Sequence, residues 1–496
     1  MTQLSAARRI QGLPGVRRAA ALPWHLVRRA SRRIGWGIAD QGMSSITNFA
    51  VNIYIARTLG AEQYGAFSLA YVTYAFVLNG SRGLSTDPLL VRFSGADVPA
   101  WRRAVSGAAG TAIVVGLVSG LAMVAIALFM QGPSRLAFLA LGLTLPGLML
   151  QDSWRFAFFA LGKGWHSFVN DAIWAVVLIP TLIMLNHTGH PSVLWYLLAW
   201  GGAATVGAAA GPLQARVLPN PRQAVRWVSR HRDLGPRYLL EGTANAASTQ
   251  FRNYGVALIL GLAALGYVQA ASTLMGPFMV VFLGMGLVIL PEAARVLRRS
   301  PRHLPAFCLV VSGGLTALGI AWGVVLLVAL PNGLGHFILG NIWRPTYPLV
   351  IPSVLSILGG CISTGAGAGL HALGAARRSL RAMMISGALY VIGSVAGAFI
   401  GGAPGALYGT AIMSWIGALI FWLELFGAIR ESDAKRGGRH RKDQLRHAVK
   451  DPAAAVSNRD TQRSRGHEGH RQQPVSHRAP SPGRGFAPSG RDDTPS

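Results

Sequence analysis

The chain has 496 residues, of which 51% are hydrophobic and only 13% are charged, and its formal net charge is +28. This balance excludes an ordinary soluble domain and an intrinsically disordered protein. Uncharged runs such as 104–130 and 305–330 exceed the roughly 20 apolar residues that a helix needs to cross a bilayer. The strands of a membrane barrel would instead alternate over about 10 residues, so an all-α polytopic membrane protein is predicted.

Twelve membrane-spanning helices are predicted, in two groups of six that the basic segment 213–237 separates. A basic segment, 1–33, precedes the first span. The tail, 429–496, is rich in Arg, His, Pro, Ser and Gly and is predicted to be disordered because it cannot bury a core. The predicted spans are 34–56, 65–84, 104–130, 136–161, 167–186, 193–212, 238–260, 266–290, 305–330, 348–374, 382–400 and 404–428.

Arginine is distributed unevenly between the two sides of this predicted arrangement. The N-terminus and the even-numbered connections are rich in it, whereas the odd-numbered connections hold only Arg57, Arg135 and Arg344. Cytoplasmic loops of membrane proteins carry such an excess of positive charge. We therefore expect a multi-pass protein of the inner (plasma) membrane with both termini in the cytoplasm.

The basic tails are predicted to attract anionic lipid headgroups rather than nucleic acid. The tail after Glu431 has one aromatic residue, Phe486, so it lacks the stacking groups of single-strand binders. Cys308 and Cys361 both fall in predicted spans, which suggests neither a disulfide framework nor a zinc site. Neither a metal nor a cofactor is predicted.

Two similar short phrases occur in the chain. A-R-T-L-G-A-E-Q-Y-G-A-F-S-L-A at 56–70 is followed by A-L-I-L-G-L-A-A-L-G-Y-V-Q-A-A at 257–271. Six residue identities share a single offset of 201: Asn52, Ala56, Leu59, Gly60, Gly65 and Ala70 match Asn253, Ala257, Leu260, Gly261, Gly266 and Ala271. The chain is therefore predicted to contain two equally oriented lobes, 34–212 and 238–428. Transporters built from parallel repeats bind their substrate between the repeats.

The phrase at 56–70 resembles the first-hairpin signature of bacterial polysaccharide exporters, the O-antigen (Wzx-type) and teichoic-acid export group. That group belongs to the multidrug/oligosaccharidyl-lipid/polysaccharide (MOP) exporter superfamily. The family usually has Pro after Leu-Gly, where this chain has Ala61. The resemblance covers about 34–428. It implies a two-lobed bundle that flips polyprenyl-diphosphate-linked saccharides from the inner to the outer leaflet for cell-surface polysaccharide synthesis.

Polar residues recur every four positions on the first span and every three or four positions on its repeat equivalent, the seventh. This spacing places each set on one helical face. The two sets are Asp40, Ser44, Asn48 and Asn52, and Glu241, Asn245, Ser248 and Arg252. We expect Asn48, Asn52 and Asn245 to line a wet path for a polar headgroup. The alternative is that such amides and hydroxyls join helices together.

Arg252 is the basic residue that lies deepest within a predicted span. An intramembrane guanidinium tends to face a cavity or a partner, so Arg252 is predicted to contact the substrate diphosphate. The alternative is a structural salt bridge, in which Glu241 cannot be the partner because three helical turns separate the two residues.

Four further charged residues lie near the cytoplasmic ends of the predicted spans: Arg82, Asp152, Arg155 and Asp171. Arg82 and Arg155 could hold a diphosphate, since arginine offers a fork of donors to phosphate oxygens. Asp152 and Arg155, at i and i+3, could instead form a local ion pair. Asp40, Asp171 and Glu241 could bind a proton or Na⁺ as coupling sites, or could neutralise an arginine.

Two other functions remain open from the sequence. A multidrug or small-molecule exporter of the same superfamily would share the two-lobed architecture. A polytopic membrane glycosyltransferase or polymerase would need acidic catalytic residues in sizeable outer loops. Here the predicted outer connections are short and their one evident acid is Glu62. The chain is therefore predicted to be a transporter rather than an enzyme.

Overall fold

The computed structural model describes residues 24–189 and 191–450; within them, side chains of 24–34, 38, 236–238, 240–246, 283, 287 and 433–450 are not described. The chain divides into two compact units, Met1–Ala428 and Ile429–Ser496. Every regular element in the described residues is helical, which confirms the predicted fold class.

The first half begins with a long helix, α2, and continues through α8. These helices are α2 (Trp24–Thr58), α3 (Ala61–Leu84), α4 (Thr86–Phe93), α5 (Val98–Leu128), α6 (Gly132–Leu161), α7 (Gly164–His187) and α8 (Val193–Ala215). The connection to the second half contains η2 (Pro221–Gln223) and α9 (Ala224–Arg230).

The second half begins at α10 and ends within the longest helix, α16. Its elements are α10 (Gly235–Leu274), α11 (Gly276–Arg299), η3 (Pro301–His303), α12 (Leu304–Ala329), η4 (Leu330–Leu334), α13 (Gly335–Leu339), η5 (Gly340–Ile342), α14 (Trp343–Thr346), η6 (Tyr347–Leu349), α15 (Val350–Ala372) and α16 (Ala376–Lys450).

Each predicted span falls on helix, apart from one or two terminal residues and a break at Met275. Positive-φ glycines divide the two longest helices: Gly261 (φ 83°) interrupts α10, and Gly402 (φ 60°) interrupts α16.

Among the described residues, eight segments are long and apolar enough to cross a membrane. One of them, 301–372, contains the two long helices α12 and α15, and another, 376–432, belongs to α16, which Gly401 and Gly402 interrupt. The chain is thus a multi-pass membrane protein.

Within the glycine-rich stretch 348–374, residues 350–372 form one continuous helix, α15. Its glycines allow close helix packing. A Cβ at Gly365 would collide with the Cys308 carbonyl of α12, and a Cβ at Gly359 would collide with Ser414 of α16. Small residues permit this close approach of helices in membranes.

Helix α16 continues to Lys450, whereas the sequence analysis predicts disorder from residue 429. Residues 429–450 contain no proline, and Arg, Lys, Gln, Leu and Ala among them are good helix formers. The first proline after this stretch is Pro452, and residues 451–496 lie outside the described part of the chain.

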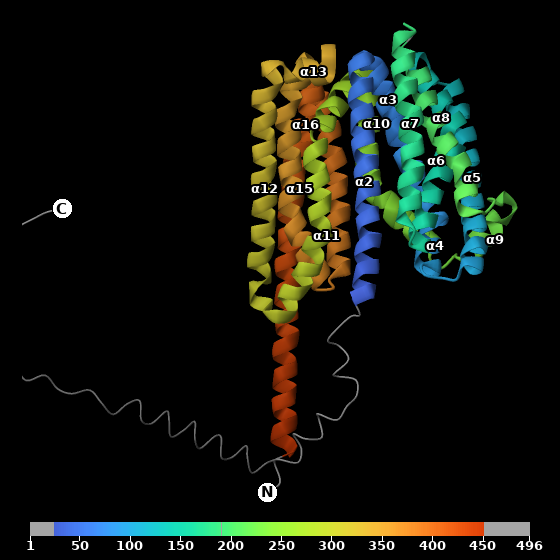
Figure 1. Cartoon of the computed structure of the whole chain (residues 1–496). Helices are drawn as coiled ribbons and strands as arrows, with labels where there is room; N and C mark the ends of the chain where they lie inside the picture. The colour runs from blue at the N-terminus through green and yellow to red at the C-terminus, as the bar shows by residue number, and fades with distance from the viewer. Residues whose placement is uncertain (1–23, 190, 451–496) are drawn as a thin grey trace, which may run out of the picture. The chain divides into compact units, whose positions relative to one another are not determined.

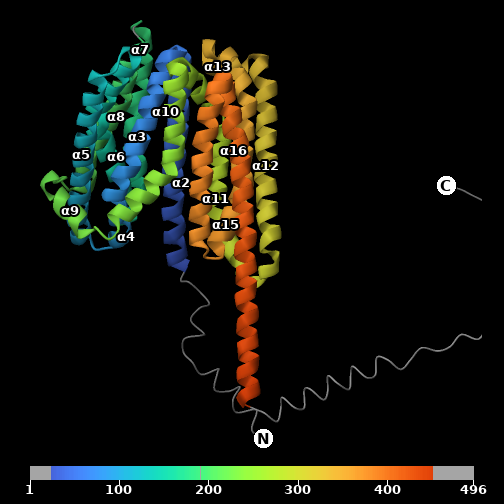
Figure 2. The same cartoon turned by 180° about the vertical axis from the view of Figure 1, so that it is seen from behind.

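Helices α3 and α10 pack against each other between the group α5–α8 and the group α11, α12 and α15 (Figures 1 and 2). A core of buried residues from both halves surrounds this contact; it includes Val51, Leu59 and Phe67 on one side and Leu274 and Leu326 on the other.

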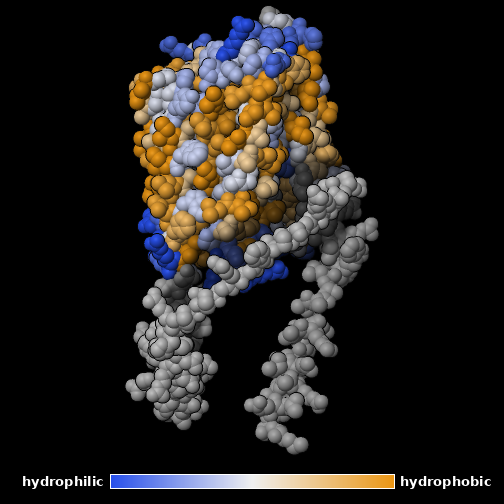
Figure 3. All heavy atoms as spheres, turned by 90° about the vertical axis from the view of Figure 1, so that its left-hand side faces the viewer, coloured by the Kyte–Doolittle hydropathy of each residue, from blue (hydrophilic) through white to orange (hydrophobic). Residues whose placement is uncertain are grey.

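On the face that includes α12, hydrophobic side chains cover most of the height between hydrophilic ends (Figure 3). Exposed Leu309, Val310 and Val328 belong to α12, as expected for a surface in contact with lipid tails.

Candidate functional site

A pocket of about 430 Å³ lies where α2 and α3 of the first half meet α10 and α11 of the second. Asn48 and Asn52 line it, and their predicted contact with a polar headgroup stays a prediction. The second half contributes neutral polar groups from the end of α10. The polar lining residues are Ser45, Asn48, Asn52, Tyr71, Gln269, Ser272 and Thr273, and none of the lining residues is charged. We call this the inter-lobe pocket.

The two asparagines of α2 are fixed by bonds to their own helix. Asn48 Nδ2 donates to the Ser44 carbonyl at 2.8 Å, and Asn52 Nδ2 donates to the Asn48 carbonyl at 2.9 Å. An amide oxygen can accept two hydrogen bonds, so each amide presents its oxygen for another donor. These local bonds orient the polar face that the four-residue spacing predicts.

The same polar face of α2 also carries a buried carboxylate that pairs with an arginine of α6. Asp40 is 0% exposed, and Arg155 Nε donates to Asp40 Oδ2 at 2.7 Å. Arg155 Nε also lies 3.8 Å from Asp171 Oδ2 of α7. Arg155 Nη2 further donates to Gln41 Oε1 at 3.2 Å. The structure thus brings three sequence-predicted residues into one cluster.

A polar pair from α6 and α7 supports this cluster. Gln151 Nε2 donates to Asp171 Oδ1 at 2.8 Å, and Asn170 Nδ2 donates to the Gly207 carbonyl of α8 at 2.8 Å. Helix α2 can approach α7 closely at Gly164, where a Cβ would lie 3.1 Å from Trp36 Cβ. Asp40 Oδ1 is buried without a hydrogen-bond partner in the described residues, so this carboxylate retains one free acceptor.

Arg82 at the end of α3 forms a second, partly buried ion pair. Its Nε and Nη2 donate to the two carboxylate oxygens of Asp152 at 2.9 and 2.6 Å, and its guanidinium carbon lies 4.8 Å from the centre of the Phe156 ring. The predicted local pair of Asp152 with Arg155 is therefore wrong. Packing of α3 on α6 brings Arg82 to Asp152 in bidentate geometry, and Arg155 turns instead toward α2 and α7.

Arg252 belongs to α10, and its side chain reaches Tyr390 of α16 within the second half. It is 6% exposed; its Nη2 donates to Asn253 Oδ1 at 2.7 Å and its Nη1 to the Tyr390 hydroxyl at 3.2 Å. Arg252 does not line the inter-lobe pocket. Both partners are neutral, and no carboxylate in the described residues forms an ion pair with it. The alternative of a structural salt bridge therefore has no support in the described part of the chain.

No family model and no curated protein matches the sequence. Among solved structures, an inward-facing multidrug resistance MATE family transporter of the MOP superfamily matches with a TM-score of 0.62 at 14% identity, over 79% of this chain and 98% of that chain. The chain has the fold of the MOP transporters. Lipid II flippase MurJ, inward closed, matches with a TM-score of 0.57 at 13% identity, over 80% and 90% of the two chains. A MOP superfamily transporter from Pyrococcus furiosus gives 0.50 at 14% identity, over 80% and 94%.

This MOP fold places the candidate residues in two groups. Asn48 and Asn52 lie between the halves, whereas Asp40, Arg82, Arg155 and Asp171 form ion pairs within the first half. Ser248 borders a cavity of about 750 Å³ inside the second half. The side chains of Glu241 and Asn245 lie outside the described part of the chain, so their predicted roles stay predictions.

The sequence analysis missed several polar residues of the site. Gln269, Ser272 and Thr273 face the inter-lobe pocket from α10, and Gln151 holds Asp171. The repeat gave a signal for one further residue: Asn253, which accepts a hydrogen bond from Arg252, is the repeat equivalent of the predicted site residue Asn52. Tyr390 gives no such signal, because it lies 138 residues from Arg252 along the chain.

Proposed function

We propose that this protein exports a polyprenyl-diphosphate-linked saccharide from the inner to the outer leaflet, by alternating access and for cell-surface polysaccharide synthesis. The lining of the inter-lobe pocket is the observation that supports this substrate class most. Amides and hydroxyls from both halves face one space, and no charged residue lines it. Neutral donors and acceptors of this kind match the hydroxyl groups of a sugar. The resemblance at 56–70 independently favours the same class.

A diphosphate also needs positive charge along its path. Arg252 is the candidate, because its described partners are the neutral Asn253 and Tyr390. Tyr390 lines the cavity of the second half, so a movement of that ring would open a route from the cavity to the guanidinium. Arg82 and Arg155 are less available, since each is paired with an aspartate.

The Asp40–Arg155–Asp171 cluster suggests how a coupling ion could act. A proton or Na⁺ bound at Asp40 or Asp171 would neutralise a carboxylate that now holds Arg155. The attraction between the carboxylate and the guanidinium would fall, and α2 could move against α6 and α7. Such a charge change at a buried pair can shift a two-state equilibrium. Glu241 remains a third candidate coupling residue.

The described conformation supports alternating access with one end closed. Arg57 of α2 donates from Nη1 to the Phe337 carbonyl of α13 at 2.9 Å, and Gly340 lies directly against Arg57. The distribution of arginines predicts that this end faces outward. Export then requires these contacts to break, while the opposite ends of the two halves approach each other.

Depletion of the protein tests the proposal. We expect a lipid-diphosphate saccharide to accumulate on the inner leaflet, and complementation by the wild-type gene to remove it. The double variant Asn48→Ala/Asn52→Ala should complement poorly. Asn332→Ala is the matched control, because Asn332 also bonds a carbonyl four residues back but lies outside the pocket. Normal lipid profiles after depletion would overturn the proposed function.

A small-molecule exporter is the second candidate, and the cavity of the second half favours it. Met279, Met383, Met384, Phe251, Phe282 and Phe421 contribute to its walls. Methionine and aromatic side chains adapt to varied apolar ligands. Drug accumulation in depleted cells separates the two functions: a rise in drug accumulation with an unchanged lipid profile would favour this second candidate.

A further inference from the structure

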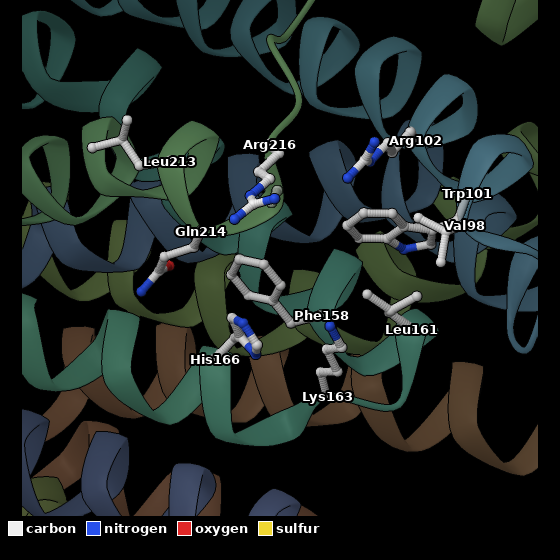
Figure 4. Close-up of a pocket in the computed structure, with 11 residues that line it drawn as sticks. Val98, Trp101, Arg102, Phe158, Leu161, Lys163, His166, Leu213, Gln214 and Arg216 are labelled. Atoms are coloured by element: carbon white, nitrogen blue, oxygen red, sulfur yellow. The ribbon is translucent and has the colours of Figure 1, made fainter.

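A hollow of about 440 Å³ lies at one end of the first half, apart from the inter-lobe pocket, with which it shares no lining residue. It is formed by the start of α5, the turn between α6 and α7, and the end of α8. Arg102, Lys163 and Arg216 line it from these three segments, and Figure 4 shows the charged ends of Arg216 and Lys163 near the ring of Phe158 and that of Arg102 near Trp101 (Figure 4). We call it the basic hollow.

The basic hollow has positive charge without a protein counter-charge. None of its lining residues is Asp or Glu. In the part of the chain that the structure describes, the side chains of Arg102, Lys163 and Arg216 make neither a hydrogen bond nor an ion pair. Arg82, Arg92 and Arg155, in the same half, each pair with an aspartate. Three like charges placed together repel one another and are stabilised by an anion.

The backbone that carries these cations is held in place. Trp101, beside Arg102, is 1% exposed and donates from Nε1 to the Ala157 carbonyl at 3.0 Å. The Lys163 amide donates to the Phe158 carbonyl at 3.0 Å, after Gly162 turns the chain at φ 73°. Arg216 ends α8 with a φ of 52°, which is uncommon for a residue other than glycine and is often functional. A fixed arrangement of donors lowers the cost of binding an anion.

A second hollow of about 520 Å³ adjoins the first and shares Arg102 and Arg216 with it. It adds Arg103, Arg226 and Arg230, and again no lining residue is acidic. Trp227 lines it, is 6% exposed, and has an indole N–H that is buried without a partner in the described residues. His166 Nδ1, in the wall of the basic hollow, likewise has no described partner. Unpaired buried polar atoms are rare and call for a ligand or solvent.

Apolar side chains beside the two hollows indicate what kind of anion binds. Leu213 is 82% exposed, Leu218 77% and Val225 84%, next to cations that lie at helix ends. A lipid offers both a phosphate at headgroup level and acyl chains for such residues, and basic pockets at the ends of membrane helices bind anionic lipid headgroups. We propose that the basic hollow binds the phosphate of an anionic phospholipid, at a site separate from the transported substrate.

Short-chain lipids allow the proposal to be tested on the full-length protein in detergent. Dioctanoyl-phosphatidylglycerol is titrated against intrinsic tryptophan fluorescence, with dioctanoyl-phosphatidylcholine and inorganic phosphate as separate arms. The test variant is Arg102→Gln/Lys163→Gln/Arg216→Asn, in which asparagine tolerates the left-handed backbone. The control is Arg298→Gln/Arg299→Gln/Arg302→Gln, which removes the same charge from exposed residues of the second half.

Phosphatidylglycerol should bind wild type more tightly than either other ligand. The test variant should bind it at least tenfold more weakly, since each basic residue near an anionic surface contributes a factor of about five. The control variant should change affinity less than about twofold.

The charge-retaining variant Arg102→Lys/Lys163→Arg/Arg216→Lys should retain most of the binding, with thermal unfolding checked for every variant. Equal losses in test and control variants, or equal affinity for phosphatidylcholine, would overturn the site. Tighter binding of inorganic phosphate would overturn the lipid as its ligand.

Discussion

Gly65 of α3 and Gly266 of α10 lie against each other across the interface between the two halves, and they are equivalent positions of the internal repeat. A Cβ on Gly65 would collide with the Leu262 carbonyl and lie 3.2 Å from the Gly266 nitrogen. A Cβ on Gly266 would collide with the Ala61 carbonyl and lie 3.2 Å from the Gly65 nitrogen. Ala61 and Leu262 are also separated by the repeat offset of 201. The repeated phrase therefore joins the halves through reciprocal contacts.

This reciprocity predicts a large effect from a single methyl group. Gly65→Ala should force α3 and α10 apart and lower the free energy of unfolding by about 1–3 kcal/mol, as overpacking of a close contact does. Thermal unfolding in detergent and export by the same variant would measure it. Gly313→Ala is the control, because its Cβ would meet nothing within 4 Å. If Gly65→Ala is as stable and active as Gly313→Ala, the close contact is not needed to join the halves.

The helices, the repeat and the polar face of α2 could be predicted because they depend on residues close in sequence or on one constant offset. Which residues pair with each other in the ion pairs could not be predicted from the sequence. Asp152 has Arg155 three positions away, yet it pairs with Arg82, 70 positions away. That choice depends on how α3 packs against α6, which hydropathy does not encode. The sequence also predicts the spans 34–56 and 65–84, although neither α2 nor α3 is among the eight segments that are long and apolar enough to cross a membrane by composition alone.

Variants of the Asp40–Arg155 pair should separate structural from functional roles. Asp40→Asn leaves the partly buried Arg155 with a weaker partner and should destabilise the protein by about 3 kcal/mol. Asp171→Asn should cost less stability, because its carboxylate lies 3.8 Å from Arg155 Nε whereas that of Asp40 lies at 2.7 Å. Thermal unfolding of the purified variants measures both.

The double variant Asp40→Asn/Arg155→Gln should recover much of the lost stability, because neither charge remains unpaired. If these residues couple ion movement to export, its export should stay absent despite normal folding. Normal export by the double variant would show that the pair serves the fold alone, and Glu241 would then be the remaining coupling candidate.

The arrangement across the membrane can be tested at two positions. Arginine asymmetry predicts that Asn332 faces outward and Lys442 faces the cytoplasm. Alkaline phosphatase fused after Asn332 should be active and fused after Lys442 inactive, with green fluorescent protein giving the opposite pattern. A fusion after Arg299 provides a second cytoplasmic reference. Placement of Asn332 and Lys442 on the same side would contradict twelve spans.

Arg252 is expected to supply the counter-charge for the substrate diphosphate. Arg252→Ala should abolish export, whereas Arg252→Lys should retain part of it, because a charge remains without the bidentate fork. Tyr390→Phe provides a control that removes the 3.2 Å hydrogen bond from Arg252 Nη1 but keeps the charge. Complementation of a depletion strain measures export, with the membrane abundance of each variant checked by blot.

The structure sharpens this test because Arg252 is buried and its described partners are neutral. If its role were only to join α10 to α16 through Asn253 and Tyr390, Arg252→Lys and Arg252→Ala would both reduce stability, and Tyr390→Phe would share part of that loss. A charge requirement instead predicts that export follows the positive charge while stability and abundance stay nearly constant. Normal export by a well-expressed Arg252→Ala variant would exclude Arg252 as the counter-charge, and the diphosphate would then require Arg82 or Arg155 to leave its aspartate.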